Sequence, residues 1–151
     1  MTRSDPTGAA VTAFDGDHRW LSNFHPSPIV VLSTTWPTVE HAFQGLKTFD
    51  ASERHRVRDA PTALDAKTLG RKVTLRPDWE QVKDDVMLLC VRAKFTQHAD
   101  LARLLLATGE AHLEEGNRHG DTVWGTVDGV GQNRLGRAVM QVRTELAQLA
   151  R

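Results

Sequence analysis

The sequence predicts an α+β protein that is mainly helical and carries two to four short strands. Three observations lead to this class. Apolar residues recur every three or four positions, the helical spacing, in several segments of the chain. Short apolar runs between turn-forming residues, the pattern of strands, are few. Strand and helix patterns do not alternate, which disfavours a doubly wound parallel sheet.

The first elements follow from polarity and from turn residues. Residues 1–13 are small and polar, and they predict a flexible leader before one domain over residues 14–151. Residues 29–32 (IVVL) lie between two groups of proline, serine and threonine residues. This arrangement predicts a strand with a turn at each end.

A helix is predicted over residues 37–49. Pro37 suits the first helical position, because a proline lacks the N–H group that would have no helical partner there. One apolar stripe with a period near 3.6 runs along the segment and comprises Val39, Ala42, Phe43, Leu46 and Phe49.

Further helices are predicted over residues 61–70, 77–93, 101–109 and 135–149. Prolines begin the first two, and Asn133 is predicted to cap the last. Residues 110–132 interrupt the helical pattern with five glycines and predict a loop.

Composition narrows the functional classes. The 151 residues contain 40% hydrophobic and 25% charged residues, which is typical of a globular protein. No apolar run approaches the roughly 20 residues of a membrane span, and the N-terminus lacks a signal-peptide pattern. These features predict a cytoplasmic protein without membrane contact. The formal net charge is zero, so any nucleic-acid contact is expected to be local.

Three polar residues of the predicted helix over residues 37–49 form a stripe beside its apolar one. At ~100° per residue, Glu40, Gln44 and Lys47 lie within about 60° of one another. A carboxylate, an amide and an amine on one helical edge could act together on a ligand. A solvated helix face with the same residues is the alternative that helix geometry leaves open.

Metal and thiol chemistry find little support in the sequence. The seven histidines include no metal-binding His pair with a helical Glu, so no metal site is expected. Cys90 is the one cysteine, and its place in an amphipathic helix predicts an inert thiol.

The glycine-rich stretch over residues 125–131 leads into the last predicted helix, whose N–H groups could bind an anion. A plain surface turn is the other interpretation of that stretch.

Several blocks of the sequence occur in the same order in a known family. They comprise WLSNFHPSP (20–28), WPTVEHAFQ (36–44) followed by Lys47, KTLGR (67–71), DWE (78–80), KFTQ (94–97), DTVWG (121–125) and GQNRLG (131–136). Together they resemble the YbiA-like family, also called NADAR for its predicted link to NAD and ADP-ribose. The resemblance extends from Phe14 to about Leu146. Trp20 and His25 depart from the family's usual residues, which leaves substrate choice open.

The resemblance implies a compact, mainly helical α+β fold and hydrolysis of an N-glycosidic bond. Family members resemble N-glycosidases with two kinds of substrate. One kind is the ribosylamino-pyrimidine intermediates of riboflavin synthesis, and the other is ADP-ribose attached to guanine in DNA or RNA. Both join a flat heterocycle through nitrogen to a phosphate-bearing ribose. No cofactor is expected, and the oligomeric state stays open.

The resemblance also implies roles for individual residues. Glu40 is the expected general acid or base, and Asp121 is expected to assist proton transfer or to hold the ribose hydroxyl groups. Lys47 is expected either to bind phosphate or to form a Schiff base with the sugar. The expected substrate-binding residues are Trp20, Ser22, Asn23, Phe24, Trp36, Phe43, Gln44, Arg71, Trp124, Gly125 and Asn133.

Two other functional classes stay open at this stage. A non-catalytic module could bind ADP-ribose or a nucleotide in the same pocket without cleaving it. A small interaction domain would bind no such ligand. The joint presence of Glu40, Lys47 and Asp121 favours an enzyme, because a binding module needs no acid–base set.

Overall fold

The computed structural model describes residues 9–150, and these residues divide into two compact units. The central unit is Asn23–Gln97, and the terminal unit joins the described parts of Met1–Ser22 and His98–Arg151. Helices dominate both units. The one sheet among the described residues has two strands, which confirms the mainly helical α+β class.

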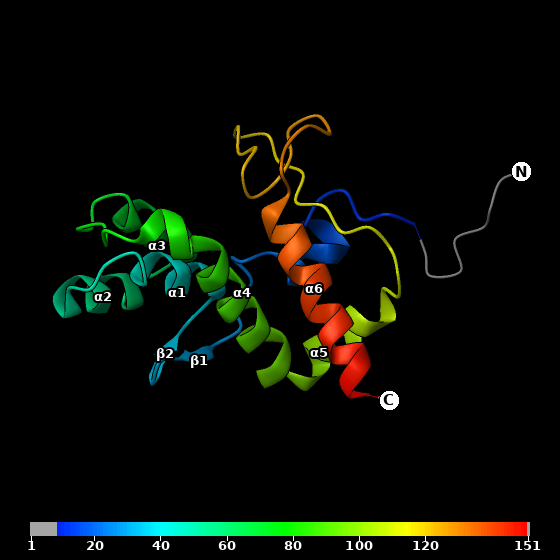
Figure 1. Ribbon diagram of the computed structural model, residues 1–151, viewed down its shortest axis with the longest axis horizontal. Coiled ribbons are helices and arrows are strands. Elements are labelled where there is room, and N and C mark those ends of the chain that lie inside the picture. The colour runs from blue at the N-terminus through cyan, green and yellow to red at the C-terminus, as the bar shows by residue number, and fades with distance from the viewer. Residues whose placement is uncertain (1–8, 151) are drawn as a thin grey trace, which may run out of the picture. The chain divides into compact units, whose positions relative to one another are not determined.

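The central unit consists of a hairpin followed by four helices (Figure 1). Its elements are β1 (Ile29–Val31), β2 (Thr34–Trp36), α1 (Val39–Gly45), α2 (Ala51–Arg58), α3 (Ala63–Gly70) and α4 (Trp79–Gln97). Helix α1 packs against α2, α3 and α4, so three helices surround the segment that carries the predicted catalytic residues.

The hairpin confirms the predicted strand and adds a second one. β1 and β2 are antiparallel, with Ile29 opposite Trp36, and the turn residues Leu32 and Ser33 have φ angles of 52° and 66°. Positive φ at both central residues is the geometry of a tight hairpin turn. The side chain of Gln97 bonds to both backbone groups of Val30, at 2.8 and 2.9 Å. This carboxamide therefore takes the place of a further strand beside β1.

Helix α1 is shorter than the sequence predicts. The helix begins at Val39, and Pro37 is not its first residue as predicted. Thr38 is the N-cap, and its Oγ1 accepts the N–H of His41 at 3.1 Å. The helix ends at Gly45, so Phe49 is not on the buried stripe and is 60% exposed. The Arg76 guanidinium lies 4.3 Å from the centre of the Phe49 ring.

Helix α2 has no counterpart among the predicted helices. It is polar on most of its surface, and Val57 is its one buried residue. Asp50 caps it by accepting the N–H of Glu53 at 2.8 Å. Val57 packs with Ala60 and Ala66 in a small apolar cluster, so contact with α3 stabilises a helix that lacks an amphipathic pattern.

Gly45 is required by the position of Trp36. The Trp36 side chain is 1% exposed, and its Nε1 donates to Val31 O at 3.3 Å. A Cβ atom at position 45 would lie 2.5 Å from Cη2 of the Trp36 ring. The indole therefore fills the space that any other side chain at position 45 would need.

We expect Gly45→Ala to lower the free energy of unfolding by about 1–3 kcal/mol, because overpacking outweighs the helix propensity gained by alanine. Urea denaturation measures this change. Ser52→Ala, on the exposed surface of α2, is the control and is expected to change stability by less than about 0.5 kcal/mol. Equal stability of the two variants would show that Trp36 moves without cost.

The terminal unit contains a short 3-10 helix, η1 (Gly16–Leu21), and two α-helices, α5 (Ala99–Ala107) and α6 (Arg134–Leu149). Helices α5 and α6 pack against each other. Residues 1–8 of the predicted leader lie outside the described residues. Val11 is buried, and its N–H donates to His112 O at 2.8 Å, so ordered contacts begin within the predicted leader.

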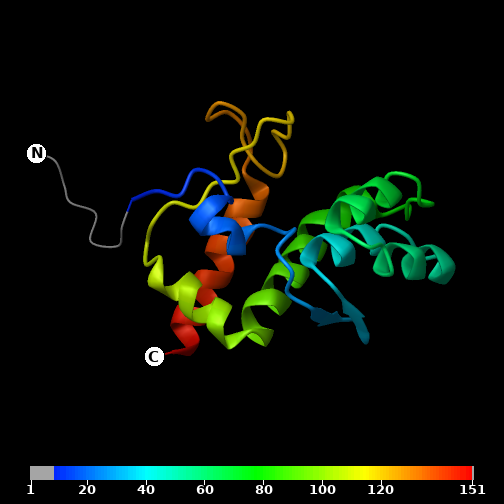
Figure 2. The ribbon, with the colours of Figure 1, turned by 180° about the vertical axis from the view of Figure 1, so that it is seen from behind.

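The glycine-rich loop after α5 folds back onto the N-terminal end of α6 (Figure 2). Gly125 lies directly against Glu115 O, where a Cβ atom would not fit. The loop therefore needs glycine at this position for close contact between two backbone segments.

Within residues 9–150, no helix combines the length and the apolar character that a bilayer crossing requires.

Candidate active site

Glu40 and Gln44 are adjacent on the buried side of α1. They are 7% and 5% exposed, and Gln44 Nε2 donates to Glu40 Oε2 at 2.7 Å. Lys47 lies in the turn after the helix, where its backbone N–H donates to Gln44 O at 3.3 Å. The predicted polar stripe is thus present, but its last member extends beyond the end of α1. Burial of Glu40 and Gln44 excludes the solvated helix face.

The amine of Lys47 has a lowered pKa. Burial is the main cause, because a charged amine loses hydration there, and the charges of Arg71 and Lys67 lower the pKa further. The Glu40 carboxylate acts in the opposite direction and raises it. The balance increases the fraction of neutral amine, which is the form that attacks carbon.

The Phe43 ring lies near this amine and contacts a second aromatic ring, that of Trp79. The rings of Phe43 and Trp79 lie 5.1 Å apart with an angle of 58°, a tilted arrangement typical of aromatic contacts. Lys47 Nζ is 5.9 Å from the centre of the Phe43 ring. Sequence reasoning did not place Trp79 in the site, although the DWE block was the signal that could have identified it.

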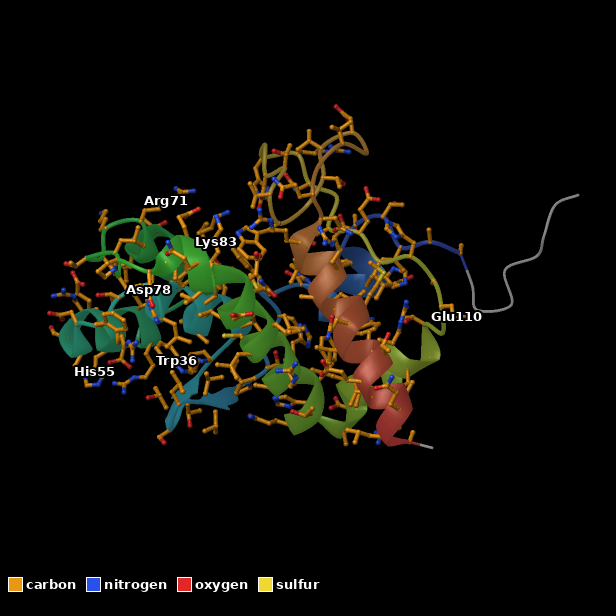
Figure 3. All side chains as sticks on the ribbon, viewed as in Figure 1. Trp36, His55, Arg71, Asp78, Lys83 and Glu110 are labelled. Atoms are coloured by element: carbon orange, nitrogen blue, oxygen red, sulfur yellow. The ribbon has the colours of Figure 1, made fainter. Side chains whose placement is uncertain are left out.

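Helix α3 adds cations to the same edge. Gly70 lies against the Gln44 side chain, so its neighbour Arg71 and Lys67, one turn earlier, are held close to Lys47. Figure 3 shows Arg71 projecting outward from the end of α3. Lys67 was not predicted as a site residue. The KTLGR block places it four residues before Arg71, on the same face of a helix, and that spacing was its signal.

Cys90 contributes no nucleophile. The thiol is fully buried in α4, and burial, with a smaller effect from the charge of Glu40, raises its pKa to about 12. A buried, protonated thiol is a poor nucleophile, which supports the predicted inert role.

Three other predicted contacts in the central unit differ in their placement. Asn23 is buried and positions the start of α1, because its carbonyl accepts the N–H of Glu40 at 3.1 Å and its Nδ2 lies 3.5 Å from Met87 Sδ. Phe24 is 40% exposed. Trp36 lies in the core, with its N–H bonded to Val31 O, and its contact with substrate remains a prediction.

The other six predicted residues belong to the terminal unit, and the structure therefore assembles the predicted set as two groups. Trp20 lies in η1, and Ser22 follows it with its N–H bonded to Arg19 O at 2.9 Å. Both are partly buried. Their contact with substrate remains a prediction.

Asp121 organises the glycine-rich loop. Its Oδ1 accepts the backbone N–H groups of Val123 and Trp124 at 3.0 and 2.9 Å, and the Asn117 side chain bonds to both backbone groups of Asp121. These bonds form an Asx turn that holds Trp124 in place. The structure thus gives Asp121 a local role, and its proton transfer remains a prediction.

Gly125 and Asn133 also stabilise this loop. Asn133 is buried, with Nδ2 donating to Leu113 O and Oδ1 accepting from Glu115 N, both at 3.0 Å. Its φ of 49° places it at the left-handed start of α6, and its side chain does not cap the helix as predicted.

At the N-terminal end of α6, the N–H groups considered for an anion are largely bonded to the preceding loop. Four backbone N–H groups there donate to loop carbonyls at 2.7–3.2 Å, namely those of Gln132, Asn133, Arg134 and Leu135. The acceptors are the carbonyls of Thr122, Gly125, Val123 and Trp124. These four N–H groups are therefore already satisfied, and the bonds link the glycine-rich stretch to the start of α6.

Within the part of the chain that the structure describes, no three His, Cys, Asp or Glu side chains cluster in a way that would bind a metal ion. The functional groups that do come together in the central unit are a buried carboxylate, a carboxamide and a desolvated amine, with two further cations. This set can support nucleophilic and acid–base chemistry on an electrophilic carbon.

Comparison with known proteins identifies the family to which the chain belongs. The model of the NADAR domain family matches residues 12–147. N-glycosidase YbiA of Escherichia coli strain K12 is 44% identical over 134 residues, which cover 87% of this chain and 83% of that protein. A riboflavin biosynthesis protein of Vibrio vulnificus is 42% identical over 90% of this chain and 38% of its own length. The solution structure of E. coli YbiA matches with a TM-score of 0.83 and 41% identity, over 93% of this chain and 85% of that one.

Proposed function

Because the chain belongs to the NADAR domain family, we propose that it is an N-glycosidase that cleaves the bond between a ribose and the nitrogen of a heterocycle. The observation that supports this proposal most directly is the pairing of a buried carboxylate, Glu40, with an amine of lowered pKa, Lys47. The relatives named N-glycosidases support the type of bond that we propose is cleaved. Glu40 and Lys47 support the proposal that this site cleaves it.

The reaction proceeds through a bond between Lys47 and the sugar. The neutral Nζ attacks C1 of the ribose, the bond from C1 to the base nitrogen breaks, and the sugar ring opens to an imine. Glu40 accepts the proton that the attacking amine loses and passes it to the departing base. Water then hydrolyses the imine, which releases the sugar and restores the amine. The carboxylate also stabilises positive charge that develops on the ribose.

A ribosylamino-pyrimidine phosphate is the leading substrate. Two relatives, from Vibrio vulnificus and Zea mays, are named riboflavin biosynthesis proteins. Lys67 and Arg71, which flank the contact between Gly70 and Gln44, provide positive charge for a substrate phosphate beside Lys47. Asp121, Trp20 and Trp124 remain proposed contacts to the sugar and the base.

ADP-ribosylated guanine is a second candidate. Five cations of residues 51–72 have no ion-pair partner among residues 9–150, namely Arg54, Arg56, Lys67, Arg71 and Lys72. A surplus of unpaired cations favours a substrate with more than one phosphate, such as ADP-ribose on DNA or RNA. The zero net charge of the chain, in contrast, favours a compact substrate.

Parallel assays with both substrates distinguish these candidates. The chain is incubated with a ribosylamino-pyrimidine phosphate and, separately, with an oligonucleotide carrying ADP-ribosyl-guanine, and the products are measured by mass spectrometry. We expect free pyrimidine and ribose phosphate from the first, at a rate at least about 10³-fold above the enzyme-free sample. Release of ADP-ribose alone would select the second substrate.

Binding without cleavage would contradict the enzymatic proposal. A module that only binds ADP-ribose would be stabilised by about 2.7 kcal/mol at a ligand concentration 100 times the dissociation constant, and it would release no product. Thermal unfolding in the presence of each ligand measures this stabilisation.

A further inference from the structure

The Gln44 side chain is buried and uses only one end of its carboxamide. It is 5% exposed, and its Nε2 donates to Glu40 Oε2 at 2.7 Å. Its Oε1 is shielded from solvent and has no hydrogen-bond partner in the described part of the chain. A buried acceptor without a partner costs about 1–3 kcal/mol, so the arrangement needs an explanation.

Gly70 accounts for the position of this oxygen. A Cβ atom on Gly70 would overlap Gln44 Oε1 and would lie 2.7 Å from Gln44 Cδ. The amide oxygen therefore rests against the backbone of α3, at a place that only glycine leaves open. With Gly70 on one side and Glu40 on the other, the carboxamide has little freedom to move.

The orientation of the carboxamide matches an ionised Glu40. An amide N–H donates to a carboxylate oxygen, whereas the reversed amide would bring two acceptor oxygens together. Donation to the charged form of an acid favours that form. The unsatisfied Oε1 is the cost of directing the N–H group at Glu40.

We propose that Gln44 is a positioning residue that holds Glu40 ionised and in one orientation. Gly70, whose backbone contacts the Gln44 carboxamide, keeps that side chain in place. The proposal rests on the function proposed above, because it concerns the same carboxylate. It differs from the direct substrate contact that the sequence predicts for Gln44. Since glutamine is neutral, its replacement leaves the charges around Glu40 unchanged.

The titratable groups near Glu40 come from α1, α3 and α4. Lys47 follows α1, and Lys67 of α3 and Arg71 just after α3 act on Lys47. The Cys90 thiol of α4 stays protonated and carries no charge. His41, on α1 itself, is engaged by Thr38 Oγ1 at 2.8 Å and by Ala60 O at 3.0 Å. All of these groups are present in a Gln44 variant, so a change in pH dependence reports the lost hydrogen bond.

Gln44→Met and Gly70→Ala test the proposal through kinetics. Methionine has a similar length without hydrogen-bonding groups, and alanine displaces the amide without removing it. We expect kcat to fall about 10- to 100-fold in each and KM to change less than about twofold. The lower inflection of the pH–rate profile, which follows ionisation of Glu40 and not loss of the Lys47 proton, is expected to move to higher pH. The double variant is expected to be no worse than the single ones, because both break the same contact. Gln81→Met, on the exposed surface of α4, is the control.

A higher KM with an unchanged pH profile would overturn the proposal and establish a direct substrate contact instead. Additive losses in the double variant would also overturn it, because Gln44 and Gly70 would then act independently.

A measurement on the folded wild type needs neither activity nor a folded Gln44 variant. In 15N-labelled protein, the side-chain NH₂ resonances of Gln44 are expected to shift with pH as Glu40 gains its proton. This titration is expected to disappear in Glu40→Gln. Resonances that do not respond to pH would overturn the positioning role even if the enzyme is active. Conversely, a clear titration in a chain that cleaves neither substrate would support the Gln44–Glu40 contact and reject the proposed function.

Discussion

Lys47→Ala is expected to lower kcat for N-glycosidic cleavage by about 10³-fold or more, because it removes the attacking amine. The amine is suited to attack because burial lowers its pKa, despite the opposing effect of the Glu40 carboxylate. The rate of product release by the wild type and the variant, measured by mass spectrometry, tests this expectation.

Two further variants separate the role of the amine from that of its charge. Lys47→Arg keeps a cation but cannot form an imine, and we expect it to be as inactive as Lys47→Ala. Lys83→Met removes a lysine that is paired with Glu80 at 2.8 Å, and we expect near-normal activity. A Lys47→Arg variant with near-normal rates would reject the covalent route and leave Lys47 as a phosphate-binding cation.

Reduction with borohydride provides a direct test of the imine. An imine between Lys47 and the opened ribose becomes a stable amine when it is reduced. The wild-type protein, treated with borohydride in the presence of substrate, is therefore expected to gain the mass of the sugar portion of that substrate. The modified peptide is expected to contain Lys47. The same treatment of Lys47→Arg is expected to leave the protein mass unchanged.

Glu40→Gln is expected to lower kcat by about 10²–10⁴-fold, because the departing base then lacks a proton donor and the amine lacks a base. Glutamine keeps the size of the buried side chain, so circular dichroism and thermal unfolding are expected to show a folded protein. Activity equal to the wild type would reject Glu40 as the acid–base group.

The same variant is expected to change the pH dependence in a defined direction. The rate rises with pH as Lys47 loses its proton, and the midpoint lies below the ordinary value of 10.5 because the pKa of Lys47 is lowered. The Glu40 carboxylate raises that pKa, so its removal lowers the pKa further and moves the midpoint to lower pH. The pH profile of the residual kcat measures this shift. An unchanged midpoint would show that the charge of Glu40 does not act on Lys47.

Local sequence was sufficient to predict several elements. The apolar run Ile29–Val31 and the helical spacing in α4 and α6 encode these elements directly, and the structure contains each of them. The stripe of Glu40, Gln44 and Lys47 was also predictable, because residues three and four apart lie on one edge of a helix. The family blocks identified Lys47 and Glu40 as the expected catalytic pair.

Other features depend on contacts between distant residues. Helix α2 has a polar sequence and is stabilised through Val57 packing against α3. The sequence predicts Trp36 as a ligand contact, whereas the structure packs its side chain against Gly45 and the hairpin in the core. The loop carbonyls that occupy the N–H groups of α6 lie 8–11 residues earlier in the chain, and no local pattern predicts that pairing.

The sequence by itself therefore determined which functional groups are present and which of them share a helical edge, because helix geometry depends on near neighbours. Only the tertiary structure decided their chemical state. Burial by surrounding elements, with Lys67 and Arg71 nearby, lowers the pKa of Lys47, and Gly70 fixes the carboxamide that bonds to Glu40. Desolvation and charge act through space, so residues distant in the sequence set the reactivity of this site.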